Sequence, residues 1–459
     1  MLTSGKLGFW GLTALVFGLM VGVGIYNLPQ NMSASARQGA IFISWIITGA
    51  GILPLVVLFK YLSDKYPQYN AGLYQYAQAG FGNYAGFNIA WGYWLCTAFS
   101  NVAYGVMLND AFGAFFPSLL NHSWEMVLFC SALIWLMYWI VSRGISIAKF
   151  INNLLALIKV LMLLLIIGVF ILYFRLDLFE IDQWGELTAC GGVWQQVRST
   201  MMITLFCFFG VEGAVMMSAR ARNKSDVGKA GFAGFFIALL LYMAVSLLCF
   251  GLMTASQLAD LNNPSIAYIM KDAVGEWAYW FVIFAVIISL IGGWVAWTLI
   301  VAQVPYEASL VGILPKNFAR LNHRSMPAYG LIASSIVMEL FLLMVVMADD
   351  IYLAALRITG LMIIPCYFFT GLFLLKQPCK PKIKIVALLA TLFCLWMAYA
   401  GGLIDFIMTS PFYLVGIIFF IKVRKESRSQ VIFTKNEKWG IALLSAGSLF
   451  AIYQSIYLF

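Results

Sequence analysis

Charged residues are scarce in this chain. They make up 10% of its 459 residues, whereas hydrophobic residues make up 63%. No stretch between the apolar runs is long enough to form a second, hydrophilic domain. This composition excludes a soluble globular protein and is typical of a polytopic membrane protein. We therefore expect an all-α protein with a single transmembrane domain over residues 1–459.

The residues of catalysis and metal binding are also few. Its only histidines, His122 and His323, lie in predicted loops, and the eight cysteines lack the spacing of metal ligands. No nucleophile and base occur together in a motif. We therefore expect no enzyme, no metal and no cofactor. A nutrient receptor is disfavoured as well, because the loops are too short for a signalling domain.

Apolar runs dominate what is present. A membrane-spanning helix needs about 20 mostly apolar residues. By that rule the chain contains thirteen candidate spans, near 8–30, 39–59, 84–117, 124–141, 150–173, 194–218, 230–253, 277–304, 328–347, 351–375, 384–401, 403–422 and 439–458. Twelve spans remain an alternative, because little more than Gly401-Gly402 separates the eleventh run from the twelfth.

The basic residues indicate the orientation. Of the 28 Lys and Arg residues, 22 fall on one side of the predicted membrane and five on the other, while Lys159 lies inside the fifth span. Loops rich in Lys and Arg stay in the cytoplasm. This predicts a multi-pass protein of the cell (inner, or cytoplasmic) membrane with a cytoplasmic N-terminus. The net charge of +9 is then an orientation signal and a contact with anionic lipid, so we expect no nucleic-acid partner.

Two apolar runs are interrupted by paired glycines. Span one contains Gly22-Val23-Gly24 followed by Pro29, and span six contains Gly210-Val211-Glu212-Gly213. Glycine favours a departure from the helix, and irregular backbone at membrane depth is tolerated where it lines a cavity. Breaks at corresponding places in two halves of a chain indicate a transporter's binding site. The alternative is that these glycines only permit close helix packing.

The position of the breaks predicts an internal repeat. Spans one to five, in residues 1–175, and spans six to ten, in residues 190–375, would be related by inversion because five is an odd number. Residues 383–459 would form appended helices. The exposed N–H groups at the first break suit a carboxylate, and the carbonyls at the second suit an ammonium group.

Glu212 is an ionisable side chain inside span six. A carboxyl group at membrane depth is costly and is by default a functional hypothesis. We interpret it as a gating or proton-sensing group. The alternative is a structural carboxyl that hydrogen-bonds to the broken backbone of span one.

Several segments resemble the amino acid–polyamine–organocation superfamily. Within it, the chain looks like the basic amino acid/polyamine antiporters, especially the arginine/ornithine type. The segments that carry this resemblance are Gly24-Ile25-Tyr26-Asn27-Leu28-Pro29-Gln30-Asn31-Met32, Gly72-Leu73-Tyr74-Gln75-Tyr76-Ala77, Gly86-Phe87-Asn88-Ile89-Ala90-Trp91-Gly92-Tyr93-Trp94, Gly210-Val211-Glu212-Gly213-Ala214 and Ser218-Ala219-Arg220-Ala221-Arg222. Phe433-Thr434-Lys435-Asn436-Glu437-Lys438 before the last run also looks like that subfamily and supports thirteen spans.

The resemblance implies a five-plus-five inverted-repeat fold with 12–13 transmembrane helices, of which helices 1 and 6 are broken. It implies exchange of a basic amino acid, arginine or lysine, for ornithine or a related amine, and suggests a homodimer. The implied substrate-binding residues are Gly22, Val23, Gly24, Ile25, Cys96, Thr97, Asn101, Phe206, Phe209, Gly210, Trp297 and Ile358. The implied gating or proton-sensing residues are Tyr93, Glu212 and Arg357.

Three positions depart from the family pattern. Val23 stands where the family usually has a small hydroxyl residue, and Phe206 where the arginine exchangers carry tryptophan, a stronger cation–π partner. Arg357 would repel a cationic substrate if it faced the cavity, or would pair with Asp349 or Asp350 if it pointed outward. These departures keep an alternative open, namely proton- or gradient-coupled transport of neutral or acidic amino acids.

Overall fold

The computed structural model describes residues 8–69, 72–120, 124–187, 190–213, 222–347 and 350–458. Over these residues the fold is all-helical, and its only β feature is an isolated bridge between Leu321 and Pro327. The all-α prediction is therefore confirmed. Eight helices of the described part are long and apolar enough to cross a membrane, and the broken first pair makes nine.

Helices occupy all thirteen predicted spans. The first span contains α1 (Phe9–Met20), a 3-10 helix η1 (Val23–Asn27) and α2 (Leu28–Ser33). The others contain α3 (Gln38–Lys65), α5 (Asn83–Gly113), α6 (Trp124–Ser142), α7 (Ile145–Leu172), α9 (Val193–Cys207), α11 (Lys224–Leu248), α14 (Glu276–Leu310), α15 (Ala328–Val345), α16 (Ile351–Lys376), α17 (Pro381–Ala400), α19 (Ser410–Glu426) and α20 (Lys435–Leu458). Shorter helices connect them: α4 (Leu73–Phe81), η2 (Pro117–Leu120), α8 (Leu176–Phe179), η4 (Cys249–Gly251), α12 (Ala255–Ala259), α13 (Ser265–Val274), η5 (Lys316–Ala319) and α18 (Leu403–Ile407).

The eleventh and twelfth predicted spans are separate helices. Gly402 has a φ of +97°, a conformation that glycine adopts without steric cost, and it divides α17 from α18. The segments on both sides of it pass the length and apolarity test for a membrane span. The local glycine pair therefore ends one helix and starts another.

Both predicted helix breaks are present. The halves of span one meet at 47°, and Pro29 lies in the first turn of α2, where its missing N–H costs nothing. In span six, α9 ends at Cys207 and the chain turns through residues 208–212, with Gly210 at a φ of +103°. The rest of that predicted span, residues 214–218, lies outside the described residues.

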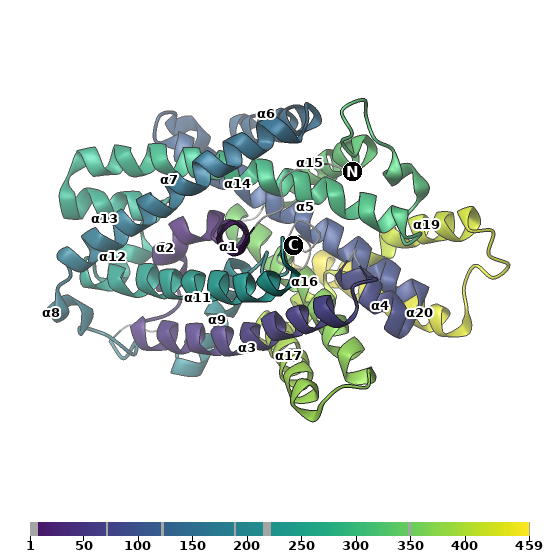
Figure 1. Ribbon diagram of the computed structural model, residues 1–459. Coiled ribbons are helices and arrows are strands. Elements are labelled where there is room, and N and C mark those ends of the chain that lie inside the picture. The colour runs from purple at the N-terminus through teal and green to yellow at the C-terminus, as the bar shows by residue number, and fades with distance from the viewer. Residues whose placement is uncertain are drawn as a thin grey trace.

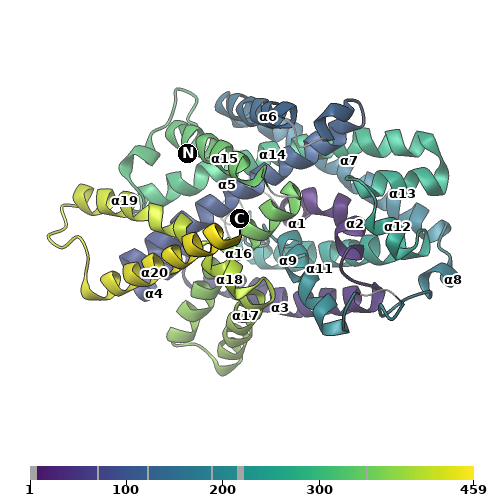
Figure 2. The same cartoon turned by 180° about the vertical axis from the view of Figure 1, so that it is seen from behind.

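The broken helices lie in the middle of the bundle. In Figure 1 the helices α3 and α11 pass below α1 and α2, while α14, α15 and α6 pass above them. Figure 2 shows the same central position of α1 and α2 from behind. The helices α5 and α16 pack along each other, as do α5 with α14 and α1 with α11. Irregular backbone is thus enclosed by protein, as its unpaired polar groups require.

Candidate functional site

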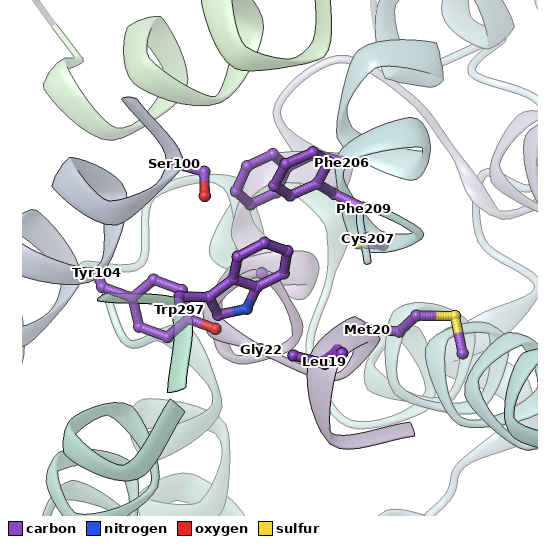
Figure 3. A pocket seen from close by; sticks show the side chains of 10 residues that line it. Leu19, Met20, Gly22, Ser100, Tyr104, Phe206, Cys207, Phe209 and Trp297 are labelled. Atoms are coloured by element: carbon purple, nitrogen blue, oxygen red, sulfur yellow. The ribbon is translucent and has the colours of Figure 1, made fainter. Parts of the chain in front are cut away.

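A small cavity lies where the two breaks meet. Figure 3 shows its wall, with the Trp297 ring near the centre, Tyr104 and Ser100 from α5, and the rings of Phe206 and Phe209. It leaves about 20 Å³ in which the centre of a water molecule can move. That is room for about one water and no more. Ten residues line it: Leu19, Met20, Gly22, Gly24, Ser100, Tyr104, Phe206, Cys207, Phe209 and Trp297.

Glycine brings the two breaks close together. A Cβ on Gly210 would lie 3.0 Å from the carbonyl oxygen of Leu19 and 3.1 Å from the Trp297 ring. A Cβ on Gly22 would collide with the Tyr104 hydroxyl. These contacts fit the prediction that the glycines permit close packing, while Gly22 and Gly24 also line the cavity. Close packing is therefore not the only structural role of Gly22 and Gly24, and their part in binding stays a prediction.

Aromatic rings pack against one another at the cavity. The rings of Phe209 and Trp297 lie parallel, with centroids 4.9 Å apart and an angle of 10° between their planes. The Tyr93 ring lies 6.5 Å from that of Phe209, centroid to centroid, and is tilted by 53° to it. Such faces can hold a guanidinium or ammonium group. None of the ten lining residues is charged.

Glu212 ties three helical segments together. One carboxylate oxygen accepts a hydrogen bond of 2.8 Å from the Tyr93 hydroxyl of α5, and the other accepts one of 2.7 Å from the Tyr367 hydroxyl of α16. The backbone N–H of Gly210 donates to the second oxygen at 3.2 Å. The carboxyl is 1% exposed. Within the described residues Glu212 thus binds the broken backbone of span six, not that of span one.

The predicted polar residues on α5 form hydrogen bonds with other parts of the protein and not at the central cavity. The Asn101 amide donates to the carbonyl of Thr97 at 2.7 Å and accepts from the Thr298 hydroxyl at 3.3 Å. Thr97 donates to the carbonyl of Trp94, and Cys96 to that of Thr359. These three side chains, like Ile25 and Gly210, are buried but do not line the cavity as it stands. The side chain of Val23 lies outside the described ones.

Arg357 and Ile358 line a different cavity, between α16, α18, α19 and α20. The Arg357 guanidinium forms an ion pair with Asp405 and also donates to the carbonyl of Gly401 at 3.2 Å. Asp350 instead accepts a hydrogen bond from the N–H of Leu353 and caps α16, and Asp349 lies outside the described residues. Arg357 therefore points away from the central cavity, with Asp405 as its partner.

Sequence reasoning missed the groups that satisfy the broken ends. The Tyr242 hydroxyl of α11 lies 2.7 Å from the carbonyl of Met20 and 2.9 Å from that of Cys207, and so bridges the ends of α1 and α9. Lys159, to which the sequence assigned no role, donates to the carbonyl of Val21 at 2.8 Å. Carbonyls at a helix C-terminus lack intrahelical partners and need such donors. The position of Lys159 inside an apolar run was the only sequence signal.

Other lining residues were missed for lack of any signal. Leu19, Met20, Ser100 and Cys207 look like ordinary core residues in the sequence, and Tyr104 is one of 22 tyrosines. Tyr367 lies in the tenth apolar run without a neighbouring motif. Among the described residues no group of three His, Cys, Asp or Glu could hold a metal ion.

Comparison with known proteins assigns the chain to a family. The family model for amino acid permeases matches residues 7–434. The chain belongs to the amino acid permease family. An arginine/agmatine antiporter of Chlamydia abortus is 39% identical to this permease over 98% of the chain and 97% of its own length. That of Chlamydia trachomatis serovar D is 37% identical over 97% of the chain and 96% of its own length.

A Clostridium perfringens protein named in general terms as an amino-acid transporter is 36% identical, over 99% of the chain and 98% of its own length. The resemblance to the basic amino acid antiporters is thus confirmed. The permease is an amino acid transporter and not an enzyme.

Proposed function

We propose that this permease exchanges a basic amino acid, arginine first, for its decarboxylated amine or for ornithine. The observation that carries the proposal is the cavity between the two breaks, which is walled by aromatic faces and lined by no charged residue. A guanidinium or ammonium group can lie over such a face without meeting a like charge. The names of the Chlamydia relatives supply arginine and agmatine as the pair to test first.

The alternative substrates lose their main support. Neutral or acidic amino acids were favoured if Arg357 faced the cavity, but its guanidinium pairs with Asp405 at a separate cavity. Val23 and Phe206 remain departures from the family pattern. We expect them to weaken binding of arginine without reversing the charge preference.

We infer alternating access around the breaks, with residues 1–175 and 190–375 as inverted repeats and residues 383–459 appended. Tyr93, Glu212 and Tyr367 join α5, α16 and the break of span six by hydrogen bonds. We assign this cluster to a gate, because separating the helices requires those bonds to break. The predicted binding residues other than Ile358 surround or support the central cavity in this proposal, whereas Arg357, predicted as a gating residue, lies with Ile358 at the separate cavity.

We further propose a cytoplasmic N-terminus in the cell membrane. Contacts between predicted inner loops support it: Lys65 donates to the carbonyl of Pro378 at 2.8 Å, and Lys376 to that of Gly80 at 3.0 Å. The Arg324 guanidinium likewise reaches the carbonyl of Arg143 at 2.8 Å. These contacts pair predicted inner loops with one another, which supports a common side for them, as the positive-inside rule requires.

Exchange in proteoliposomes tests the function. Vesicles that hold purified protein and unlabelled arginine should take up labelled arginine rapidly, and internal agmatine or ornithine should replace internal arginine. Empty vesicles should show little uptake, because exchange needs a counter-substrate. Uptake of serine or glutamate but not arginine would contradict the proposal. The homodimer that the resemblance suggests is tested separately by crosslinking in the membrane.

A further inference from the structure

A third cavity, distinct from the central one and from that of Arg357, lies at the end of the bundle where α5 ends and α16 begins. Its volume is about 180 Å³, compared with about 20 Å³ for the central cavity. Its lining is rich in oxygen-bearing side chains, and none of its members is basic. The lining residues are Val106, Asn109, Asp110, Leu119, Leu120, Met126, Asn262, Asn263, Asp350, Ile351 and Tyr352.

Two of these side chains are deeply buried and carry a polar atom that has no hydrogen-bond partner among the described residues. Asn109 is 1% exposed; its amide nitrogen donates to the carbonyl of Leu119 at 3.0 Å, but its amide oxygen accepts nothing. Tyr352 is also 1% exposed, and its hydroxyl has no hydrogen-bond partner. The amide oxygen of Asn263 is unpartnered as well. Buried polar groups are normally hydrogen-bonded, so the two amide oxygens indicate a missing donor at this cavity, and the Tyr352 hydroxyl indicates a missing partner between the two cavities.

Two carboxyl groups accompany the free oxygens. Asp110 and Asp350 both line the cavity, and within the described part of the chain neither forms an ion pair. Asp350 caps α16 through one carboxylate oxygen. Carboxylates and carbonyl oxygens without cations suit a ligand that brings both positive charge and several N–H donors. Guanidinium and ammonium groups have these properties.

The cavity lies on a path to the central one. Its residue Tyr352 has its hydroxyl 3.8 Å from the position of a Cβ on Gly24, which lines the central cavity. On α5, Tyr104 lines the central cavity and Asp110 the other one. Asp110 follows Tyr104 by six positions, which correspond to about 9 Å along a helix. Tyr352 therefore stands between the two cavities.

We propose that this acidic cavity is an outer binding subsite for the cationic head of the substrate, from which the substrate passes Tyr352 to the central cavity. The inference rests on the proposed function and on the proposed orientation, which places Asp110 and Asp350 at the external end. Clefts lined by one sign of charge raise the local concentration of the opposite ion and speed its binding. The subsite selects for positive charge before the central site is reached.

Uptake of labelled arginine by intact cells that express the full chain tests the subsite, because only the outer face then meets labelled substrate. Asp110→Asn and Asp350→Asn keep the side-chain shape, and asparagine still caps a helix. We expect each to raise the external KM for arginine about threefold or more, and the pair to raise it further. The maximal rate should fall much less than the affinity. Efflux driven from inside should be less affected than uptake.

Asp177→Asn is the matched control. Asp177 is an exposed carboxylate on α8, in a loop on the same predicted outer side, and it does not line the cavity. It should leave KM unchanged. Asn262→Asp provides a gain-of-function arm, because it adds a carboxylate at an exposed position of the lining and should lower KM. This arm decides the question if the neutralised variants fail to reach the membrane.

The outcomes are distinct. A wild type that takes up no arginine or agmatine overturns the proposed function and this subsite with it. A wild type that exchanges arginine, with KM unchanged in Asp110→Asn/Asp350→Asn and in Asn262→Asp, overturns the subsite alone. An equal rise of KM in Asp177→Asn also overturns it, because the effect would then come from general surface charge.

Discussion

The ammonium of Lys159 donates a hydrogen bond of 2.8 Å to the carbonyl of Val21, at the point where α1 ends. A lysine of span five thus holds the broken end of span one. Lys159 is 4% exposed, so this contact is made inside the protein. An ionisable side chain buried at membrane depth is costly and is retained where it has a role. Its role here is to fix the break beside the cavity.

Lys159→Met tests that role. It leaves the Val21 carbonyl unsatisfied, which costs about 1–3 kcal/mol, but it also removes a buried charge, so the net effect on stability should be small. Exchange should fall about tenfold or more, because the geometry of the break is lost. Thr13→Val removes a side-chain hydrogen bond from the same helix, away from the break, and is the control. Undiminished exchange by Lys159→Met would contradict the role.

The Tyr93–Glu212–Tyr367 cluster should hold the gate shut. Tyr367→Phe removes one hydrogen bond to Glu212, worth about 1.5–3 kcal/mol when the acceptor is charged. Buried Cys96, one turn from Tyr93 on α5, should then react faster with a small membrane-impermeant thiol reagent, as followed by mass spectrometry. Tyr413→Phe is the control, because its hydroxyl donates to the Met362 carbonyl instead. Equal labelling of Cys96 in the wild type and both variants would remove the gate assignment.

The aromatic residues that line the central cavity, Phe206, Phe209 and Trp297, should set its affinity for cations. Phe206→Trp presents a stronger cation–π face at the cavity and should lower the dissociation constant for arginine about twofold to fivefold. Phe209→Ala removes the partner of Trp297 and a wall of the cavity, and should weaken binding of arginine. Equilibrium binding to purified protein measures both. An unchanged arginine affinity in Phe206→Trp and Phe209→Ala would show that the cation is held elsewhere.

Close approach at Gly22 provides a rescue experiment. Gly22→Ala places a methyl group against the Tyr104 hydroxyl and should reduce exchange strongly. Adding Tyr104→Phe removes that oxygen and should restore part of the rate. Gly18→Ala, where a Cβ meets nothing within 4 Å, is the control. If Tyr104→Phe gives no rescue, the need for glycine at position 22 has another cause.

Arg357 should not set the charge preference of the substrate. Its side chain is 56% exposed and that of Asp405 is 36% exposed, so the ion pair contributes about 1 kcal/mol or less to stability. Arg357→Ala and Asp405→Ala should leave the preference for arginine over glutamate unchanged in counterflow. A variant that gained glutamate exchange would place Arg357 in the substrate path after all.

Apolar run length sufficed to locate the helices, because a spanning helix satisfies its own backbone and needs no knowledge of its neighbours. The same holds for the breaks, since Gly22, Gly24 and Gly210 carry a local backbone signal. The cavity walls at Phe206, Phe209 and Trp297 came only from the resemblance to a known family.

Partners across the bundle could not be predicted. Tyr367 meets Glu212 across 155 positions of sequence, and Tyr242 meets Met20 across 222. Each of these tyrosines is one among 22 in an apolar chain, and only tertiary packing distinguishes it. For the same reason Arg357 was expected to pair with a neighbouring aspartate and instead reaches Asp405 on a separate helix.

The stacking of Phe209 on Trp297 competes with the binding of a cation to either ring. Each ring covers one face of the other, so that face is not open to a cation while the two rings are stacked. An aromatic pair of this kind contributes about 0.5–1.5 kcal/mol. A guanidinium that separates the two rings must gain at least that much free energy from its own contacts. Ligands that make only weak contacts with a ring therefore fail to part the stack. The selectivity among amino acids then depends on the ring contact that each must displace as much as on the contacts that each makes.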